Sequence, residues 1–112
     1  MRASDVDRTL AALADPTRRG VIDLLRKKPR RAGELADALE MTPPAMSRHL
    51  RVLRKSGLVE ETVLEEDARV RVYRLRREAF ESLRDWLDRV EAFWTMQLDS
   101  FVEHAERTRG KR

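Results

Sequence analysis

The chain of 112 residues contains no cysteine, and aromatic residues make up only 5% of it. The absence of cysteine excludes disulfide bonds, thiol redox sensing and cysteine-ligated metal sites. Because aromatic side chains are scarce, a hydrophobic core must consist mostly of Leu, Val, Ile and Ala. A chain of this length forms one domain, residues 1–112, and so modest a core often gains stability by pairing with a second copy.

Long apolar runs are also missing. No run approaches the roughly 18 residues of a membrane-spanning helix, and residues 1–7 lack the apolar segment of a secretory signal peptide. These two absences predict a cytoplasmic protein.

Charged residues make up 39% of the chain and are unevenly distributed, although the formal net charge is only +4. Residues 16–31 contain seven Lys or Arg and one acidic residue, and residues 42–76 contain eight against five. Residues 77–106 contain three basic and eight acidic residues, whereas residues 107–112 add four basic ones. A polyanion such as DNA would be attracted to the basic segments and repelled by 77–106.

Residues 42–58 have the pattern of a short helix with well-defined ends. Thr42 is a suitable N-cap, Pro43 stands at the first helical position, and Gly57 follows the last turn. The apolar face comprises Met46, Leu50 and Leu53. The outer face comprises Ser47, Arg48, Arg51 and Lys55, with Arg54 at its border. Such a helix fits the DNA major groove, but an ordinary amphipathic helix with a solvated basic face would have the same pattern.

Three shorter helices are predicted before this segment. The first covers 3–14 with Ser4 as its cap, and its apolar face comprises Val6, Leu10 and Leu13. The second begins with Asp15 as the cap and Pro16 at its first position, and its buried side comprises Val21, Ile22 and Leu25. Gly20 within it predicts close packing against a neighbouring helix, since an interior glycine otherwise destabilises a helix by roughly 1 kcal/mol relative to Ala.

The third helix covers about 32–39, with Leu35, Ala36 and Leu39 facing inward. The basic run 26–31 before it, interrupted by Pro29, is a loop that serves either as a solvated connector or as a phosphate contact. A brief turn at 40–41 leads into the helix at 42–58. Two short helices joined by such a turn, the second with a basic face, form a helix-turn-helix candidate.

After Gly57 the hydrophobic period changes to two. Residues 58–64 and 68–75, separated by a turn at 65–67, predict a β-hairpin with one buried and one basic face. The apolar positions are Val70, Val72 and Leu75, and the basic positions are Arg69, Arg71, Arg74 and Arg76. A hairpin directly after a helix-turn-helix is a wing. A plain edge hairpin whose charges deter aggregation would explain the arginines but not their position.

Residues 77–106 predict one long helix. Its apolar stripe comprises Phe80, Leu83, Leu87, Val90, Trp94, Leu98 and Phe101, widened by Trp86 and Phe93. Roughly 30 helical residues would span about 45 Å, more than so small a domain can cover alone. The stripe therefore predicts pairing between two subunits, with the first helix sharing the interface. The alternative is packing over the first helix of the same chain.

Four segments together resemble the ArsR/SmtB family of bacterial winged-helix repressors. They are Leu-Ala-Asp-Pro-Thr-Arg-Arg at 13–19, Gly-Glu-Leu-Ala at 33–36, Met-Ser-Arg-His-Leu-Arg-Val-Leu-Arg-Lys-Ser-Gly-Leu-Val at 46–59 and Val-Tyr-Arg-Leu at 72–75. The resemblance covers about residues 8–105. The ending Phe-Trp-Thr-Met-Gln-Leu-Asp at 93–99 is similar to the metal-independent, SdpR-like members.

The resemblance implies a mainly α fold with a small β-hairpin: a winged helix-turn-helix of about five helices and a two-stranded wing that dimerises through its terminal helices. The implied organisation is a dimerisation helix at 1–14, a helical core at 15–58, the wing at 59–76, a second dimerisation helix at 77–106 and a basic tail at 107–112. The implied function is a homodimeric repressor of its own operon that binds a twofold-symmetric DNA operator and uses no cofactor.

The site residues follow from the same resemblance and from the patterns above. The predicted base-reading residues are Pro43, Pro44, Ser47, Arg48, His49 and Arg51. The predicted phosphate or wing contacts are Arg18, Arg19, Arg54, Lys55, Arg69 and Arg71. The predicted dimer interface comprises Val6, Leu10, Leu13, Leu83, Trp86, Leu87, Val90, Phe93, Trp94, Leu98 and Phe101.

Three departures from the family pattern matter. Metal-sensing relatives use cysteines on the third helix or a His-containing pattern on the last helix. This chain has no cysteine and only His104 on its last helix, so no metal site is expected. Glu40 stands where relatives often carry Gly, and a positive φ there would cost on the order of 1–3 kcal/mol unless the turn is shaped differently. Pro43 and Pro44 lack backbone donors but offer rings to thymine methyl groups, so Ser47 and Arg48 are expected to supply the hydrogen-bonded readout, Arg48 to guanine.

Other functions fit less well. A winged-helix module for protein–protein assembly would not require a basic recognition helix and wing. An enzyme has little support, because no Cys nucleophile, Gly-rich phosphate loop or His–carboxylate cluster is visible. A protein or small-molecule inducer remains open. A small molecule could bind near Trp86, Phe93 and Trp94, although packing in the core is the favoured use of these aromatics.

Overall fold

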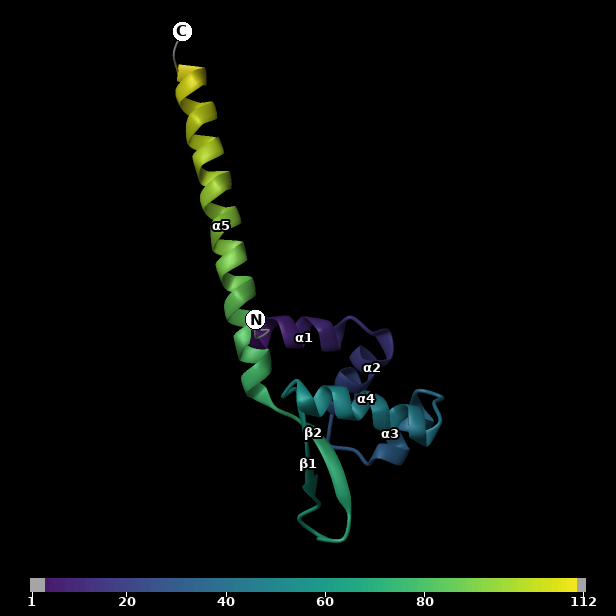
Figure 1. The fold of residues 1–112 in the computed structure, drawn as a ribbon. Coiled ribbons are helices and arrows are strands. Elements are labelled where there is room, and N and C mark those ends of the chain that lie inside the picture. Colours follow the sequence, from purple (N-terminus) through teal and green to yellow (C-terminus); the bar gives the residue numbers. More distant parts are fainter. Residues whose placement is uncertain (1–3, 111–112) are drawn as a thin grey trace.

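The computed structural model describes residues 4–110 and contains five helices and a two-stranded hairpin. In chain order the elements are α1 (Asp5–Leu13), α2 (Pro16–Leu25), α3 (Ala32–Ala38), α4 (Pro43–Lys55), β1 (Val59–Val63), β2 (Arg71–Leu75) and α5 (Arg77–Gly110). Helices α1 to α4 and the hairpin form a compact head, from which α5 projects as a long rod (Figure 1). The winged helix-turn-helix predicted from the sequence is confirmed.

The ends of the chain limit two of the sequence predictions. Residues 1–3 of the dimerisation segment predicted at 1–14, and residues 111–112 of the basic tail predicted at 107–112, lie outside the described residues. Residues 107–110 continue α5 to its last turn.

The core lies where α2, α3, α4 and the start of β1 meet. Its buried members include Val21, Leu25, Leu35, Ala36, Met46, Leu50, Leu53, Leu58 and Val59. The predicted apolar face of α4 is confirmed, because Met46, Leu50 and Leu53 are each no more than 1% exposed. Fully burying a side chain of this size stabilises a fold by about 1.5–3 kcal/mol, so the core fixes the orientation of α4.

The helix starts follow the predicted caps. The Ser4 hydroxyl accepts the N–H of Asp7, whose carboxylate in turn accepts the N–H of Ser4. In α2 the Asp15 carboxylate accepts two N–H groups of the first turn, which lowers its pKa. In α4 the Thr42 hydroxyl accepts the N–H of Ala45 at 3.3 Å. Each cap satisfies backbone donors that the helix itself leaves unpaired.

Glu40 ends α3 in a left-handed backbone conformation. The Met41 N–H donates to the Ala36 carbonyl at 2.8 Å and the Glu40 N–H donates to the Asp37 carbonyl at 3.2 Å, the two hydrogen bonds of a Schellman motif. Glu40 has φ of +53°, a conformation that residues other than glycine adopt at a steric cost. Of the two possibilities for this turn, the structure has the one with positive φ.

The end of α4 repeats the same motif with a glycine. The Leu58 N–H donates to the Leu53 carbonyl and the Gly57 N–H donates to the Arg54 carbonyl, both at 3.0 Å. Gly57 has φ of +74°, as predicted for the residue that stops this helix.

The strands of the hairpin pair antiparallel, with Val59 opposite Leu75 and Val63 opposite Arg71. β2 begins at Arg71 rather than at 68, so the connection is longer than the predicted turn at 65–67. The prediction of one apolar and one basic face is wrong. Alternate residues share a face, which places Arg71 with Tyr73 and Leu75, and places Arg74 with the buried Val72.

Two close approaches join the loops and helices of the head. The N–H and C=O groups of Arg30 pair with those of Tyr73 at 2.7 and 3.1 Å, so the basic loop at 26–31 is held against the wing. A methyl group built at Gly20 would lie 3.1 Å from Leu39 Cδ2, which confirms the predicted close packing at this glycine.

Helix α5 is covered only near its start. Phe80, Leu83 and Val90 are half-buried, and α1 packs against this part of the helix (Figure 1). Beyond Val90 the apolar side chains are exposed: Phe93, Trp94, Met96, Leu98, Phe101 and Val102. The aromatic side chains Trp86, Phe93 and Trp94 do not pack in the core of the single chain, contrary to the use favoured from the sequence. Helix α1 begins beside α5 and runs away from it toward α2, so it does not follow the apolar stripe (Figure 1).

The two matched helix ends allow a test of backbone strain. We expect Glu40→Gly to raise the free energy of unfolding by about 1 kcal/mol, because glycine adopts positive φ without the steric cost of a Cβ. Gly57→Ala should lower it by a similar amount, since a Cβ there meets nothing within 4 Å and only the backbone is strained. Urea unfolding followed by circular dichroism measures both.

The control is Glu40→Gln, which removes the charge of this exposed side chain but keeps its Cβ. Its unfolding free energy should lie within about 0.5 kcal/mol of the parent. Stabilisation by Gln equal to that by Gly would show that the charge, and not the backbone conformation, destabilises the turn.

Candidate nucleic-acid interface

The exposed side of α4 carries the polar and basic residues that the sequence placed there. Ser47, Arg48, Arg51 and Lys55 are all exposed, opposite the buried stripe. Within residues 4–110, none of the three cations in this set forms an ion pair with an acidic side chain. The positive charge of this face is therefore available to an external anion.

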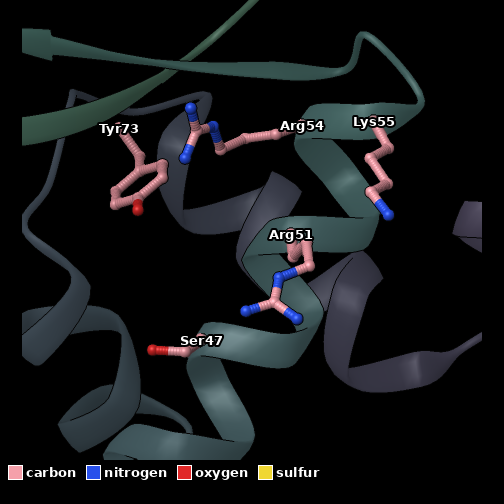
Figure 2. A pocket seen from close by; sticks show the side chains of 5 residues that line it. All are labelled: Ser47, Arg51, Arg54, Lys55 and Tyr73. Carbon is pink, nitrogen blue, oxygen red and sulfur yellow. The ribbon is translucent and has the colours of Figure 1, made fainter.

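An open hollow lies between α4 and the wing. It is lined by Ser47, Arg51, Arg54, Lys55 and Tyr73. Arg54 extends from α4 toward Tyr73 of β2, whereas Lys55 points away from it (Figure 2). The hollow brings the helix and the wing together in one polar, cationic surface.

Glu61 of β1 links α4 to both strands of the wing. Its carboxylate accepts hydrogen bonds from Arg71 Nη1 at 2.8 Å, Arg54 Nη1 at 3.4 Å and the Tyr73 hydroxyl at 3.3 Å. The Glu61 side chain is 17% exposed. The hydrogen bond from Arg71 is the main reason that the pKa of Glu61 lies below its ordinary value, so this carboxylate is ionised at neutral pH. Burial and the neighbouring Glu61 raise the pKa of the Tyr73 hydroxyl.

The other wing arginines are paired as well. In the loop before β2, Arg69 pairs with Asp67 at 3.1 Å, and this hydrogen bond lowers the pKa of the Asp67 carboxyl. On the strand itself, Arg74 pairs with Glu60. The structure thus places Arg69 and Arg71 on the wing as predicted, but with internal acids that the sequence pattern did not reveal.

Arg18 and Arg19 have a structural role that sequence reasoning missed. Arg18 Nε donates to the Ala12 carbonyl at 2.6 Å, and Arg19 Nη1 donates to the Leu13 carbonyl at 2.7 Å. Carbonyl groups at a helix C-terminus lack helical partners, and cations are favourable there. The two guanidinium groups therefore cap α1 and hold it against α2. The signal in the sequence was the spacing of six residues back to the end of the first helix.

His49 differs from its neighbours on α4. It is half-buried, and its Nδ1 lies 3.4 Å from Arg18 Nη1, so its ring faces α2 rather than the outer side of α4. The prolines Pro43 and Pro44 are exposed at the start of α4, where their rings form an apolar patch next to the cationic face.

The predicted dimer-interface residues fall into two groups. Val6, Leu13, Leu83 and Val90 are half-buried, and Leu13 packs against the core of the head. The exposed group comprises Leu10, Trp86, Leu87, Phe93, Trp94, Leu98 and Phe101. Phe101, at 71% exposure, has the most exposed side chain of this set.

None of the helices in residues 4–110 is long and apolar enough to cross a membrane. Across the same range, no three His, Asp or Glu side chains are grouped as metal ligands would be.

Comparison with known proteins identifies the fold and the family. Residues 15–61 match the family described as bacterial regulatory protein, arsR family. The chain is 39% identical over 97 residues to the HTH-type transcriptional regulator Rv2034 of Mycobacterium tuberculosis, a match that covers 87% of this chain and 85% of that protein. It is 34% identical over 50 residues to the transcriptional repressor SdpR of Bacillus subtilis, covering 45% of this chain and 56% of SdpR.

A solved structure extends the likeness to almost the whole chain. An ArsR-like transcriptional regulator from Rhodococcus sp. RHA1 superposes with a TM-score of 0.75 at 28% identity, covering 90% of this chain and 92% of that one. The family match at residues 15–61 includes α3 and α4, the helix that presents the cationic face. The chain belongs to the ArsR family, and it is a DNA-binding transcriptional regulator rather than an enzyme.

Proposed function

We propose that the protein is a homodimeric repressor of its own operon that binds a twofold-symmetric operator, with α4 of each protomer in a major groove. The observation that supports this most strongly is the exposed face of α4, where Arg48, Arg51 and Lys55 have no acidic partner within residues 4–110. A helix in the major groove needs such a face to reach base edges and the flanking phosphates. A DNA partner of this kind places the protein in the cytoplasm.

Base readout is assigned to the exposed residues at the start of α4. Pro43 and Pro44 offer rings to thymine methyl groups, and Ser47 and Arg48 supply hydrogen bonds, with Arg48 donating to guanine. Arg51 lies one turn further along the same face. His49 faces Arg18, which favours a packing or phosphate-side role over base contact.

Dimerisation is assigned to α5 together with α1. The 34 residues of α5 span about 51 Å, and most of the apolar stripe beyond α1 is exposed in the single chain. An apolar stripe of this length in water favours a second helix over it. Two protomers paired in this way present two copies of α4, as a twofold-symmetric operator requires.

Arg48→Ala tests base readout. We expect affinity for the operator to fall about 10- to 100-fold, the value of one good bidentate contact, while affinity for a shuffled duplex changes far less. Fluorescence anisotropy with the DNA upstream of the chain's own gene and with a shuffled duplex of equal length measures both. Equal losses on the two duplexes would make Arg48 a phosphate contact.

The matched control is Lys55→Ala on the same exposed face. It should weaken binding to both duplexes alike and reduce the slope of log affinity against log salt by about 1, as expected for one lost phosphate contact.

Trp94→Glu tests the dimer. Trp94 is 61% exposed and lies within the apolar stripe. A carboxylate there would be buried without a partner on pairing, so we expect a shift to monomers at micromolar concentration and a loss of operator affinity of at least about tenfold. Sedimentation velocity and the anisotropy assay give the two readouts. Ala92→Glu, on the opposite side of the same helix, should leave both unchanged; a dimer that survived Trp94→Glu intact would refute this interface.

A further inference from the structure

We propose that Glu61 is a specificity-determining residue, because it occupies Arg54 and Arg71 as an internal anion and so limits contact with phosphates of non-operator DNA. This inference rests on the proposed mode of DNA binding through α4 and the wing. It assigns a role to an acidic side chain placed inside a surface that otherwise attracts a polyanion.

The position of Glu61 suits this role. It lies in the middle of β1, opposite Tyr73, and its side chain is largely covered, whereas those of Arg54 and Arg71 are 54% and 75% exposed. The two guanidinium groups are thus accessible to solvent while their partner lies behind them. A phosphate group entering the hollow meets Arg54, and one approaching β2 meets Arg71, and each of these arginines is already engaged by the Glu61 carboxylate.

The strength of the pairing follows from its surroundings. Fully exposed ion pairs contribute little to the stability of a protein, whereas a hydrogen bond between an arginine and a mostly buried carboxylate is stronger. Glu61 also accepts the Tyr73 hydroxyl, so three donors hold its carboxylate in place. A phosphate that binds either arginine must compete with its hydrogen bond to Glu61, and it leaves the Glu61 carboxylate with fewer donors.

The consequence differs between operator and non-operator DNA. Non-specific binding depends almost wholly on the number of cations that neutralise phosphates. With Arg54 and Arg71 held by Glu61, that number is set mainly by the outer face of α4. Operator binding has the additional base contacts of that face and depends less on the two arginines. Glu61 therefore lowers non-specific affinity more than operator affinity.

Glu61→Gln tests the proposal, since it removes the charge but keeps the shape and a hydrogen-bond acceptor. We expect affinity for a shuffled duplex to rise about three- to tenfold at 0.1 M salt, and the salt slope to steepen by about 1 to 2 as up to two more phosphates are neutralised. The ratio of operator to non-specific affinity should fall. Anisotropy titrations at several salt concentrations measure all three quantities.

The control for net charge is Glu81→Gln, an exposed position on α5. It makes the same change in total charge and should alter non-specific affinity by less than about twofold. In the Arg54→Ala, Arg71→Ala background, Glu61→Gln should no longer change the salt slope. An increase that persists there would show that Glu61 acts by general repulsion and not through these arginines.

Structural and electrostatic roles separate in this design. If Glu61 serves only to hold the wing in place, Glu61→Gln will lower the thermal midpoint of unfolding, leave the non-specific affinity unchanged or reduced, and give no steeper salt slope. The inference is then wrong.

A second variant is available if Glu61→Gln does not fold. Glu61→Asp keeps the charge on a shorter side chain and should steepen the slope by a smaller amount, and an unchanged slope would overturn the proposal. Failure of the parent protein to distinguish operator from shuffled DNA would instead refute the proposed function.

Discussion

The burial of three side chains on one side of α4 is the constraint on which the rest of the structure depends. Met46, Leu50 and Leu53 lie in the centre of the head, and truncation of any one would cost about 2–5 kcal/mol of a total stability of about 5–15 kcal/mol. A rigid helix with three inward residues has no freedom to rotate. The orientation of its cationic outer face is therefore a direct result of core packing, and the caps at Thr42 and Gly57 set the length of that face.

The arginines of this chain divide into two classes that composition does not separate. Those on the outer face of α4 have no acidic partner among the described residues, whereas the wing arginines are paired with Glu60, Glu61 and Asp67. Arg18 and Arg19 are used to cap α1. A count of basic residues thus overstates the charge that a polyanion meets, and the internal acceptors decide which cations remain available.

The two proposed functions of the chain lie in different parts of the molecule. The cationic face and the wing belong to the compact head, while the exposed apolar stripe runs along the rod of α5 (Figure 1). α1 connects them, because it packs against the start of α5 and is held to α2 by the two arginine caps.

Helix ends, the apolar stripes and the existence of a hairpin could be read from the sequence, because caps, glycine stops and periodicity depend on residues within one or two turns of each other. Trp94 and Phe101 were recognised as part of a stripe, but only the structure revealed how little of it α1 covers. The sequence left the conformation of Glu40 open, and the partners of Glu61 were decided by tertiary structure. Arg54 reaches Glu61 from α4, and Arg71 and Tyr73 reach it from β2. Arg18 likewise meets His49 across 31 positions of the chain. Local pattern cannot specify such pairings, since they exist only once the core has set the distances between elements.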